Sequence, residues 1–286
     1  MRRRSRLILC LLVVGALPCA DAHAFSSADV AAVQVGLRAH GFYAGNVDGV
    51  SGPGTARGIR ALQRAAGLTV DGIVGPATRH ALGRIGRHPY GSRSLSAGSV
   101  GFDVAALQFK LESHGFPLGT VDGGFGSHTV AALIKFQRSA GLTADGVAGP
   151  ATFAALSGPP PSAPFALRRP IAAPIGDPYG PRGSGWHPGI DFPAPTGTAV
   201  TAAAYGRVIE AGWDTGGYGN LVVIAHGSST VTMYAHLSSI AVRVGEVVGA
   251  GALVGRVGST GFATGPHLHF EVRVRGAAVN PLPALG

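Results

Sequence analysis

The side chains best suited to metal chemistry lie in the C-terminal part of the chain. His187 and Asp191 fall in the run His-Pro-Gly-Ile-Asp, His267 and His269 flank one leucine, and His236 follows Tyr-Ala. Zinc takes imidazole nitrogen and carboxylate oxygen as ligands. A catalytic zinc site uses three protein ligands and leaves a fourth position open for water. These five groups are therefore enough for a catalytic metal site with two side chains to spare.

The chemistry that such a set could perform is hydrolysis of an amide. Zinc lowers the pKa of bound water toward neutrality and so makes hydroxide available. Amide hydrolysis also needs a proton carrier and a donor for the developing oxyanion, and histidines that are not ligands can serve as both. The residue types alone do not say which histidines bind the metal.

The spacing of these residues predicts the elements that hold them. The proline and glycine between His187 and Asp191 exclude a helix, so these two side chains should come from a loop and the strand that follows it. Alternate residues on a strand point to the same face. His267 and His269 should therefore enter one groove, while Leu268 points to the opposite face.

The surroundings of these residues are typical of an all-β domain. Short runs rich in Val, Ile and Tyr are separated by glycine-rich turns, and helical periodicity is nearly absent. The expected strands are 199–203, 206–211, 221–225, 231–236, 253–257 and 268–274. Trp186, Trp213 and Tyr218 could line the rim of a groove or lie in the core, and we expect a turn or supporting role for His226.

The first half of the chain is a duplication. His-Gly-Phe at 40–42 and Val-Asp-Gly at 47–49 recur 74 residues later without insertion, as do Gly-Leu-Thr at 67–69 and Gly-Pro-Ala-Thr at 75–78. Apolar residues at helical spacing, with glycine as a stop signal, predict a small three-helix unit in each copy. The copies are expected at 26–83 and 100–157.

The segments between these units read as linkers. Residues 84–99 are rich in Gly, Arg and Ser, and 158–167 form a stiff, Pro-rich spacer before a C-terminal domain at 168–286. We therefore expect the repeats to be folding units separate from the C-terminal half, so that their loss would not disturb its site.

Residues 1–24 are typical of a secretory signal peptide. Arginines precede an apolar run of eleven residues, which is too short to span a bilayer, and Ala-x-Ala patterns allow cleavage after Ala22 or after Ala24. Both cysteines lie in this segment, so the mature chain would hold no disulfide. We expect a secreted or extracytoplasmic protein, in the periplasm or cell wall, with no stable membrane insertion after signal removal.

Composition and charge narrow the choice of partner. With 46% hydrophobic and 13% charged residues, the chain has enough apolar content to build cores and is not disordered. The net charge of +9 would become +6 after signal removal, because four arginines and one aspartate leave. The mature chain would have neither a basic run nor interleaved aromatic residues, so an anionic cell-wall polymer fits better than nucleic acid.

The two repeats resemble the three-helix peptidoglycan-binding domain found on many wall hydrolases. The matching residues of the second copy are Asp122-Gly123, Phe125-Gly126, Thr129, Ala132, Phe136-Gln137, Gly141-Leu142, Asp145-Gly146, Gly149 and Thr152. In the first copy Ser51 stands in place of the phenylalanine at 125 and Leu62 in place of that at 136. The resemblance implies peptidoglycan as the partner, with weaker binding by the first copy.

Three segments of the C-terminal half, at 185–192, 234–238 and 265–271, resemble the motifs of the lysostaphin-like zinc metallopeptidases. The resemblance implies an antiparallel β fold with Zn²⁺ as the cofactor. It implies His187, Asp191 and His269 as metal ligands. It also implies His236 and His267 as the catalytic pair that polarises water and stabilises the transition state.

Together these resemblances predict a multidomain chain, with two small all-α three-helix repeats before an all-β antiparallel metallopeptidase domain. The function implied is that of a secreted zinc metalloendopeptidase that hydrolyses peptide bonds in peptidoglycan and is anchored by its repeats. A non-catalytic activator of a separate hydrolase and a metal-dependent amidase or carboxypeptidase are the alternatives. The sequence leaves open whether a D,D-crosslink or a Gly-rich bridge is cut, and it leaves open the oligomeric state.

Overall fold

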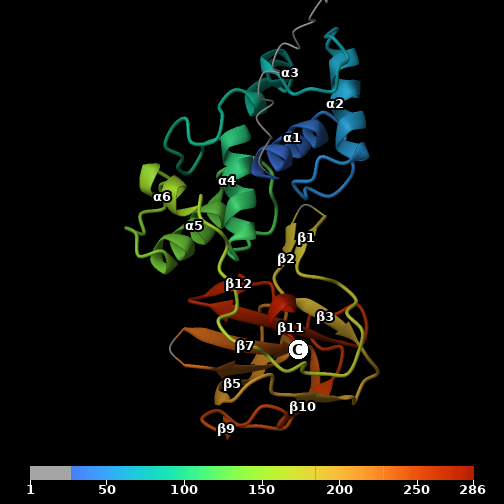
Figure 1. Cartoon of the computed structure of the whole chain (residues 1–286), viewed down its shortest axis with the longest axis vertical. Coiled ribbons are helices and arrows are strands. Elements are labelled where there is room, and N and C mark those ends of the chain that lie inside the picture. Colours follow the sequence, from blue (N-terminus) through green and yellow to red (C-terminus); the bar gives the residue numbers. More distant parts are fainter. Residues whose placement is uncertain (1–26, 184, 228) are drawn as a thin grey trace, which may run out of the picture.

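The computed structural model describes residues 27–286 except 184 and 228, so the expected signal peptide lies outside the described residues. Six α-helices occupy the first half of this described chain and twelve β-strands the second (Figure 1). The predicted order of two helical repeats followed by an antiparallel β-rich half is confirmed. Within the described residues, no helix is both long and apolar enough to cross a membrane.

Each repeat consists of two long helices and one short helix. The helices are α1 Ser27–Ala39, α2 Pro53–Ala65 and α3 Pro76–Ala81 in the first copy, and α4 Phe102–Ser113, α5 Ser127–Ser139 and α6 Pro150–Ala155 in the second; a short 3-10 helix, η1 Gly83–Gly86, follows α3. A proline opens three of these helices, where its missing N–H costs nothing. Gly41 and Gly115 follow α1 and α4 with φ of 75° and 87°, a conformation that other residues rarely adopt.

A buried glutamine fixes each Asp-Gly turn of the repeats. The side-chain amide of Gln137 donates to Oδ1 of Asp145 at 2.9 Å and to the carbonyl of Val147 at 3.0 Å, and its oxygen accepts from the N–H of Gly146 at 3.0 Å. The same glutamine–aspartate–threonine network forms around Gln34, Gln63 and Gln108. Each repeat therefore contains two related half-units, each built around one such network, in addition to the duplication of the whole repeat.

The two copies pack against each other instead of lying apart. Helix α1 lies along α4, and small side chains, among them Ala31 and Ala106, let the two helices approach closely. Phe109 of the second copy is 4% exposed and belongs to the same apolar cluster as Leu37 of the first. The Gly-, Arg- and Ser-rich segment between the copies therefore connects two units that share a core.

The second half is built from two antiparallel sheets and a projecting hairpin. The larger sheet has the order β12-β11-β7-β6-β5-β9 with β3 added beside β11, the smaller has the order β4-β10-β8, and β1 pairs with β2. The strands are β1 Gly180–Arg182, β2 Gly185–His187, β3 Ile190–Pro193, β4 Ala199–Thr201, β5 Gly206–Asp214, β6 Gly219–Ala225, β7 Thr230–Ala235, β8 Leu237–Ile240, β9 Val247–Val248, β10 Leu253–Val257, β11 His267–Val274 and β12 Ala277–Val279, followed by the 3-10 helix η2 Leu282–Ala284.

One apolar core is shared by the two sheets. Phe192, Phe270 and Tyr234 of the larger sheet meet Val254 and Leu237 of the smaller one, and all five are fully buried. Each of the six expected strands overlaps an observed one, and β3 is the strand expected to follow the His187 loop and to carry Asp191. The short strands β1, β2, β8, β9 and β12 were not expected.

The helical and β halves are in direct contact, which the Pro-rich spacer did not suggest. Hairpin β1–β2 projects from the β half toward the helices (Figure 1), and the N–H of Val47 donates to the carbonyl of Gly183 at 2.9 Å. Further along, the N–H of Ala278 donates to the carbonyl of Gly115 at 2.9 Å. These contacts were not foreseen because a linker's composition does not reveal which surfaces meet across it. The expectation that the repeats are folding units separate from the C-terminal half stays a prediction.

The glutamine networks give a stability prediction. Replacing buried Gln137 by Leu leaves the buried N–H of Gly146 without its acceptor, so we expect the free energy of unfolding of the helical half to fall by about 1–3 kcal/mol. Denaturant unfolding followed by far-UV circular dichroism measures this. Arg138→Leu, at the neighbouring exposed position of the same helix, is the control, and equal stability of the two variants would contradict the prediction.

Candidate metal centre

Three side chains converge where the hairpin and two strands of the larger sheet meet. His187 ends β2, Asp191 lies in β3, and His269 lies directly opposite Asp191 on β11. Nε2 of His187 lies 3.0 Å from Nδ1 of His269, which lies 2.7 Å from Oδ1 of Asp191; the distance from Nε2 of His187 to Oδ1 of Asp191 is 3.2 Å. The pairing of β3 with β11 thus brings together residues far apart in the chain.

The hydrogen bonds behind these rings determine which nitrogen carries the proton. Nδ1 of His187 donates to the carbonyl of Pro178 at 2.9 Å, and Nε2 of His269 donates to the Glu271 carboxylate at 3.0 Å. In each neutral ring the nitrogen that faces the other two groups is then left with a lone pair. Two nitrogens and one carboxylate oxygen therefore present lone pairs to the same point, an arrangement that calls for a cation.

The spacing of the three atoms suits a small tetrahedral ion. Metal–ligand bonds of about 2.0–2.1 Å in tetrahedral geometry place neighbouring ligand atoms about 3.3 Å apart, close to the separations found here. The His187 side chain is 1% exposed and that of His269 7%, whereas Asp191 is 14% exposed and faces a groove. The set can hold a metal ion with one side open to a substrate.

The charges around His269 also favour a cation at this point. Burial lowers the pKa of His269, but hydrogen bonds and attraction from Asp191 and Glu271 outweigh this and raise it to about 9. Burial would raise the pKa of Asp191, but its contacts with the two histidines hold it well below its usual range. A proton on His269 or a bound metal ion can meet this demand for positive charge.

Glu271 supports the cluster from behind. Its carboxylate is fully buried and accepts hydrogen bonds from His269, from the Tyr218 hydroxyl at 2.7 Å and from Nε of Arg273 at 2.7 Å. Burial opposes ionisation, yet His269 and Arg273 lower the pKa of Glu271 to about 2. A carboxylate on the far nitrogen fixes the ring orientation and raises the basicity of a ligating histidine.

His236 and His267 form a second pair beside the cluster. Their ring centroids lie 4.8 Å apart. Nδ1 of His236 donates to the Thr260 carbonyl at 2.8 Å, and Nδ1 of His267 donates to the Gly265 carbonyl at 2.8 Å. The Nε2 atoms of both rings are therefore free to accept or give a proton, and that of His267 lies 3.8 Å from Oδ1 of Asp191. The structure thus places all five predicted site residues in one groove.

The backbone at His236 is in an uncommon conformation. With φ of 59°, it is one of two non-glycine residues with positive φ in the described chain. The left-handed region costs an L-residue about 1 kcal/mol or more, and residues held there cluster at functional sites. His236 sits between β7 and β8, and its N–H donates to the carbonyl of Tyr218 at 2.9 Å. Burial, the largest influence, lowers its pKa, so its ring is neutral at neutral pH.

Comparison with known proteins agrees with the geometry. Residues 185–281 match the family model described as "Peptidase family M23", and residues 26–82 and 101–156 match the one described as "Putative peptidoglycan binding domain". This chain contains a peptidase family M23 domain. The helical repeats before it are peptidoglycan-binding repeats, in line with the resemblance that their sequence shows.

The relatives of the M23 domain include enzymes and an activator. It is 51% identical over 96 residues to the DD-carboxypeptidase/endopeptidase Mpg of Neisseria meningitidis, covering 34% of this chain and 22% of the relative. It is 43% identical over 98 residues to the murein hydrolase activator NlpD of Salmonella typhimurium, covering 34% of this chain and 26% of the relative. The match thus spans about a quarter of the length of these curated relatives.

Solved structures add a similar domain. The catalytic domain of lysostaphin from Staphylococcus simulans is 39% identical, and the match covers 39% of this chain and 90% of that chain with a TM-score of 0.37.

The groove of the M23 domain has a volume of about 390 Å³. Arg182, Tyr218, Phe262 and Thr264 line it beside the histidines, and Phe262 is 85% exposed at its edge. Of the aromatic residues considered for the rim, Tyr218 lines the groove, whereas Trp186 packs on the helical repeats and Trp213 is exposed elsewhere.

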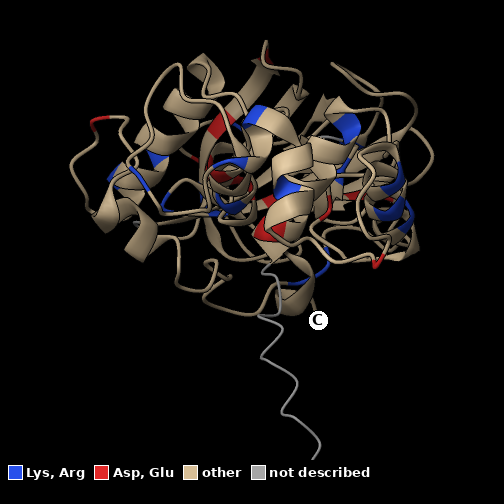
Figure 2. Cartoon of the chain, turned by 90° about the horizontal axis from the view of Figure 1, so that it is seen from above, with Lys and Arg blue, Asp and Glu red and all other residues tan. Residues whose placement is uncertain are grey.

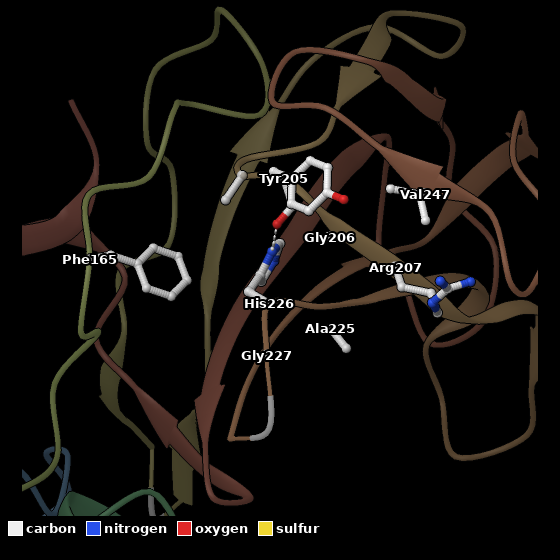
Figure 3. A pocket seen from close by; sticks show the side chains of 9 residues that line it. Phe165, Tyr205, Gly206, Arg207, Ala225, His226, Gly227 and Val247 are labelled. Carbon is white, nitrogen blue, oxygen red and sulfur yellow. Dashed lines mark hydrogen bonds between the residues drawn. The ribbon is translucent and has the colours of Figure 1, made fainter.

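A larger pocket of about 480 Å³ lies elsewhere on the M23 domain (Figure 3). Its histidine, His226, has both ring nitrogens occupied, by the Tyr205 carbonyl at 2.8 Å and by Oγ1 of Thr232 at 2.7 Å. Figure 3 shows this ring bonded to the backbone of Tyr205, with Phe165 to one side. His226 therefore supports a turn, as expected, and offers no free nitrogen for chemistry.

Sequence reasoning missed the residues that orient the site. Glu271 continues the alternation of His267 and His269 along β11, so the spacing placed it on the same face, and this signal was available. Thr260 and Pro178 act through their backbone carbonyls, and such contacts have no signature in a side-chain pattern.

Glu271 gives the prediction for this site. Glu271→Gln keeps the shape but removes the charge behind His269, so we expect metal affinity, measured by competition with a chromophoric chelator for Zn²⁺, to fall about 10–100-fold. Glu210→Gln, at an exposed position of β5, is the matched control and should leave affinity unchanged. Equal affinity of both variants would show that Glu271 does not tune the cluster.

Proposed function

We propose that this chain is a secreted zinc metalloendopeptidase that hydrolyses peptide bonds in peptidoglycan and is held at the wall by its repeats. The observation that carries the proposal is the convergence of three lone-pair donors, His187, Asp191 and His269, beside two further histidines with free Nε2 atoms. The M23 family match and the peptidoglycan-binding repeats supply the substrate class and an extracytoplasmic site of action.

In this proposal His187, Asp191 and His269, which all line the groove, would hold Zn²⁺. Bound zinc lowers the pKa of water and polarises a carbonyl group. Pro178 and Glu271 keep the two imidazole ligands in the tautomers that face the ion. A substrate in the groove would have to place its scissile amide beside these three residues.

His236 and His267 carry the proton transfers. A neutral ring whose Nδ1–H is held by a backbone carbonyl presents a basic Nε2 and can accept the proton of an attacking water. Once protonated, the same nitrogen can donate to the developing oxyanion or to the leaving amine. Two such rings 4.8 Å apart allow one to act as base while the other stabilises negative charge.

The repeats hold the enzyme at its polymer. Arg57, Arg60 and Arg64 on α2 are exposed, and such basic side chains suit an anionic wall. Figure 2 shows that Lys and Arg recur on several helices. Phe125 and Phe136 of the second copy are 3% and 5% exposed. In the first copy Leu62 is buried at the position of Phe136, whereas Ser51 at the position of Phe125 is exposed, and the weaker binding expected of this copy stays a prediction.

A second candidate is a non-catalytic activator of a separate hydrolase, because the M23 domain is also 43% identical to the activator NlpD. The presence of all five site residues in one groove favours the enzyme. A non-catalytic activator alone would release no product from purified wall. Mass spectrometry after digestion would show a new amine within the stem or bridge for an endopeptidase, and separation of glycan from stem for an amidase.

Metal dependence is the first test. We expect the mature protein to bind about one Zn²⁺ and a chelator to abolish wall digestion, which Zn²⁺ should restore. Metal content by atomic emission and turnover on purified wall are measured on the same preparation. Full activity after the metal has been stripped would refute the zinc mechanism.

The second test separates ligands from proton carriers. His269→Ala removes a metal ligand, so zinc content and activity should fall together. His267→Ala and His236→Ala should keep zinc and lose activity by about a hundredfold to ten-thousandfold. His226→Ala, outside the groove, is the control for loss of an imidazole. Loss of zinc from His267→Ala with retention in His269→Ala would reverse the two assignments.

A further inference from the structure

The hairpin β1–β2 joins the metal cluster to the helical repeats. Its second strand ends at His187, and its turn receives the hydrogen bond from Val47 of the first repeat. Gly185 lies so close to the second repeat that an added Cβ would overlap the carbonyl oxygen of Gly119. A metal-site residue is thus carried by an element whose outer side is covered by both repeats.

Trp186 is the centre of this contact. It packs on the apolar cluster shared by the two repeats, where the ring of Phe109 on α4 meets it edge-on with centroids 5.9 Å apart. On its other side, Tyr179 meets it at 5.5 Å, also edge-on. The indole Nε1 is buried without a hydrogen-bond partner, so apolar packing, not a polar contact, holds the ring in place.

The same two aromatic residues flank the atoms that orient His187. Trp186 directly precedes His187, and Tyr179 directly follows Pro178, whose carbonyl accepts the proton of His187 Nδ1 at 2.9 Å. The hairpin register, with Gly180 opposite His187, holds these two segments together. Packing of Phe109 on Trp186, which in turn meets Tyr179, therefore bears on the strand that carries His187 and on the carbonyl of Pro178 that sets the tautomer of this histidine.

A second contact secures the docked position. The Tyr179 hydroxyl donates to the carbonyl of Ala278 at 3.1 Å, and the N–H of Ala278 donates to Gly115 of the second repeat at 2.9 Å. Ala277 beside it is buried in the core of that repeat. The helical half thus touches the M23 domain at β12 as well as at the hairpin, which is more than a flexible tether would provide.

We propose that the docked repeats are part of the support of the metal centre, with Trp186 as the positioning residue through which they hold His187. Undocking would free the hairpin and with it both His187 and the Pro178 carbonyl, so the metal would bind more weakly. Coupling of this kind is reciprocal, so the bound metal also strengthens docking. The inference needs the site to bind a metal and does not need the chain to be a peptidase.

The test substitutes a residue of the second repeat and measures tryptophan emission and Zn²⁺ affinity of the full-length mature protein. In a Trp213→Phe background Trp186 is the only tryptophan of the chain, so its emission reports whether it is buried. Phe109→Ala removes the ring that faces Trp186 and alters nothing in the M23 domain. We expect emission to shift to longer wavelength and the dissociation constant for Zn²⁺ to rise about 10–100-fold, as for loss of other groups that orient a ligand.

The matched control is Phe153→Ala in the same repeat. Phe153 packs against Tyr90, away from the hairpin, and its loss should change neither emission nor Zn²⁺ affinity. Phe109→Leu keeps most of the buried volume and should restore affinity in part. A shift in emission with unchanged Zn²⁺ affinity, or equal loss of affinity in the control, would overturn the proposal.

A second variant covers the case in which Phe109→Ala unfolds the repeat, as circular dichroism would show. Gly185→Ala adds a methyl group that collides with Gly119 across the contact and leaves the repeat's core intact. It should shift the emission and weaken Zn²⁺ binding together, and an unshifted emission or an unchanged affinity counts against the proposal. A wild-type protein that binds Zn²⁺ yet does not digest wall would refute the proposed function alone.

Discussion

The convergence of two imidazoles and one carboxylate on a single point constrains the rest of the M23 domain. His187, Asp191 and His269 would repel one another at about 3 Å unless a cation or a proton sits among them. Backbone hydrogen bonds hold two of them in place, because β3 pairs with β11 in a register that puts Asp191 opposite His269. Behind them Glu271 and the Pro178 carbonyl fix the two rings, so the site's chemistry depends on groups that never face the groove.

In the helical half, neutral side chains hold buried polar groups in place. A glutamine amide can donate and accept at once, so one buried side chain can satisfy the turn's N–H groups, an aspartate and a threonine. Four such networks, around Gln34, Gln63, Gln108 and Gln137, hold the helices of each repeat in place. Because these networks are internal, the outer surfaces of the helices remain available for contact, between the two copies and with the hairpin.

The sequence predicted the elements with strong periodicity and the residues with distinctive chemistry. Alternation in His267-Leu268-His269 placed both imidazoles on one face and Leu268 in the core, and the structure confirms this. The 74-residue offset predicted the two helical copies. Strands of two to four residues, such as β1 and β9, are too short to show an alternation of apolar and polar residues. They form because a neighbouring strand pairs with them. Contacts across the linkers were missed because the sequence does not distinguish an alanine exposed to solvent from one buried against another domain.

The position of Trp186 shows how the two halves depend on each other. On an isolated β domain the hairpin would expose an indole and a tyrosine beside a metal ligand, and an apolar surface of that size is costly in water. The repeats cover it with Phe109 and the cluster around it. The helical half thus buries Trp186, which the β half alone would leave exposed. Trp186 lies on β2, the strand that ends at His187. Because the repeats bury the hairpin that carries His187, a force on them would reach this residue through the contacts at Trp186, Gly183 and Gly185.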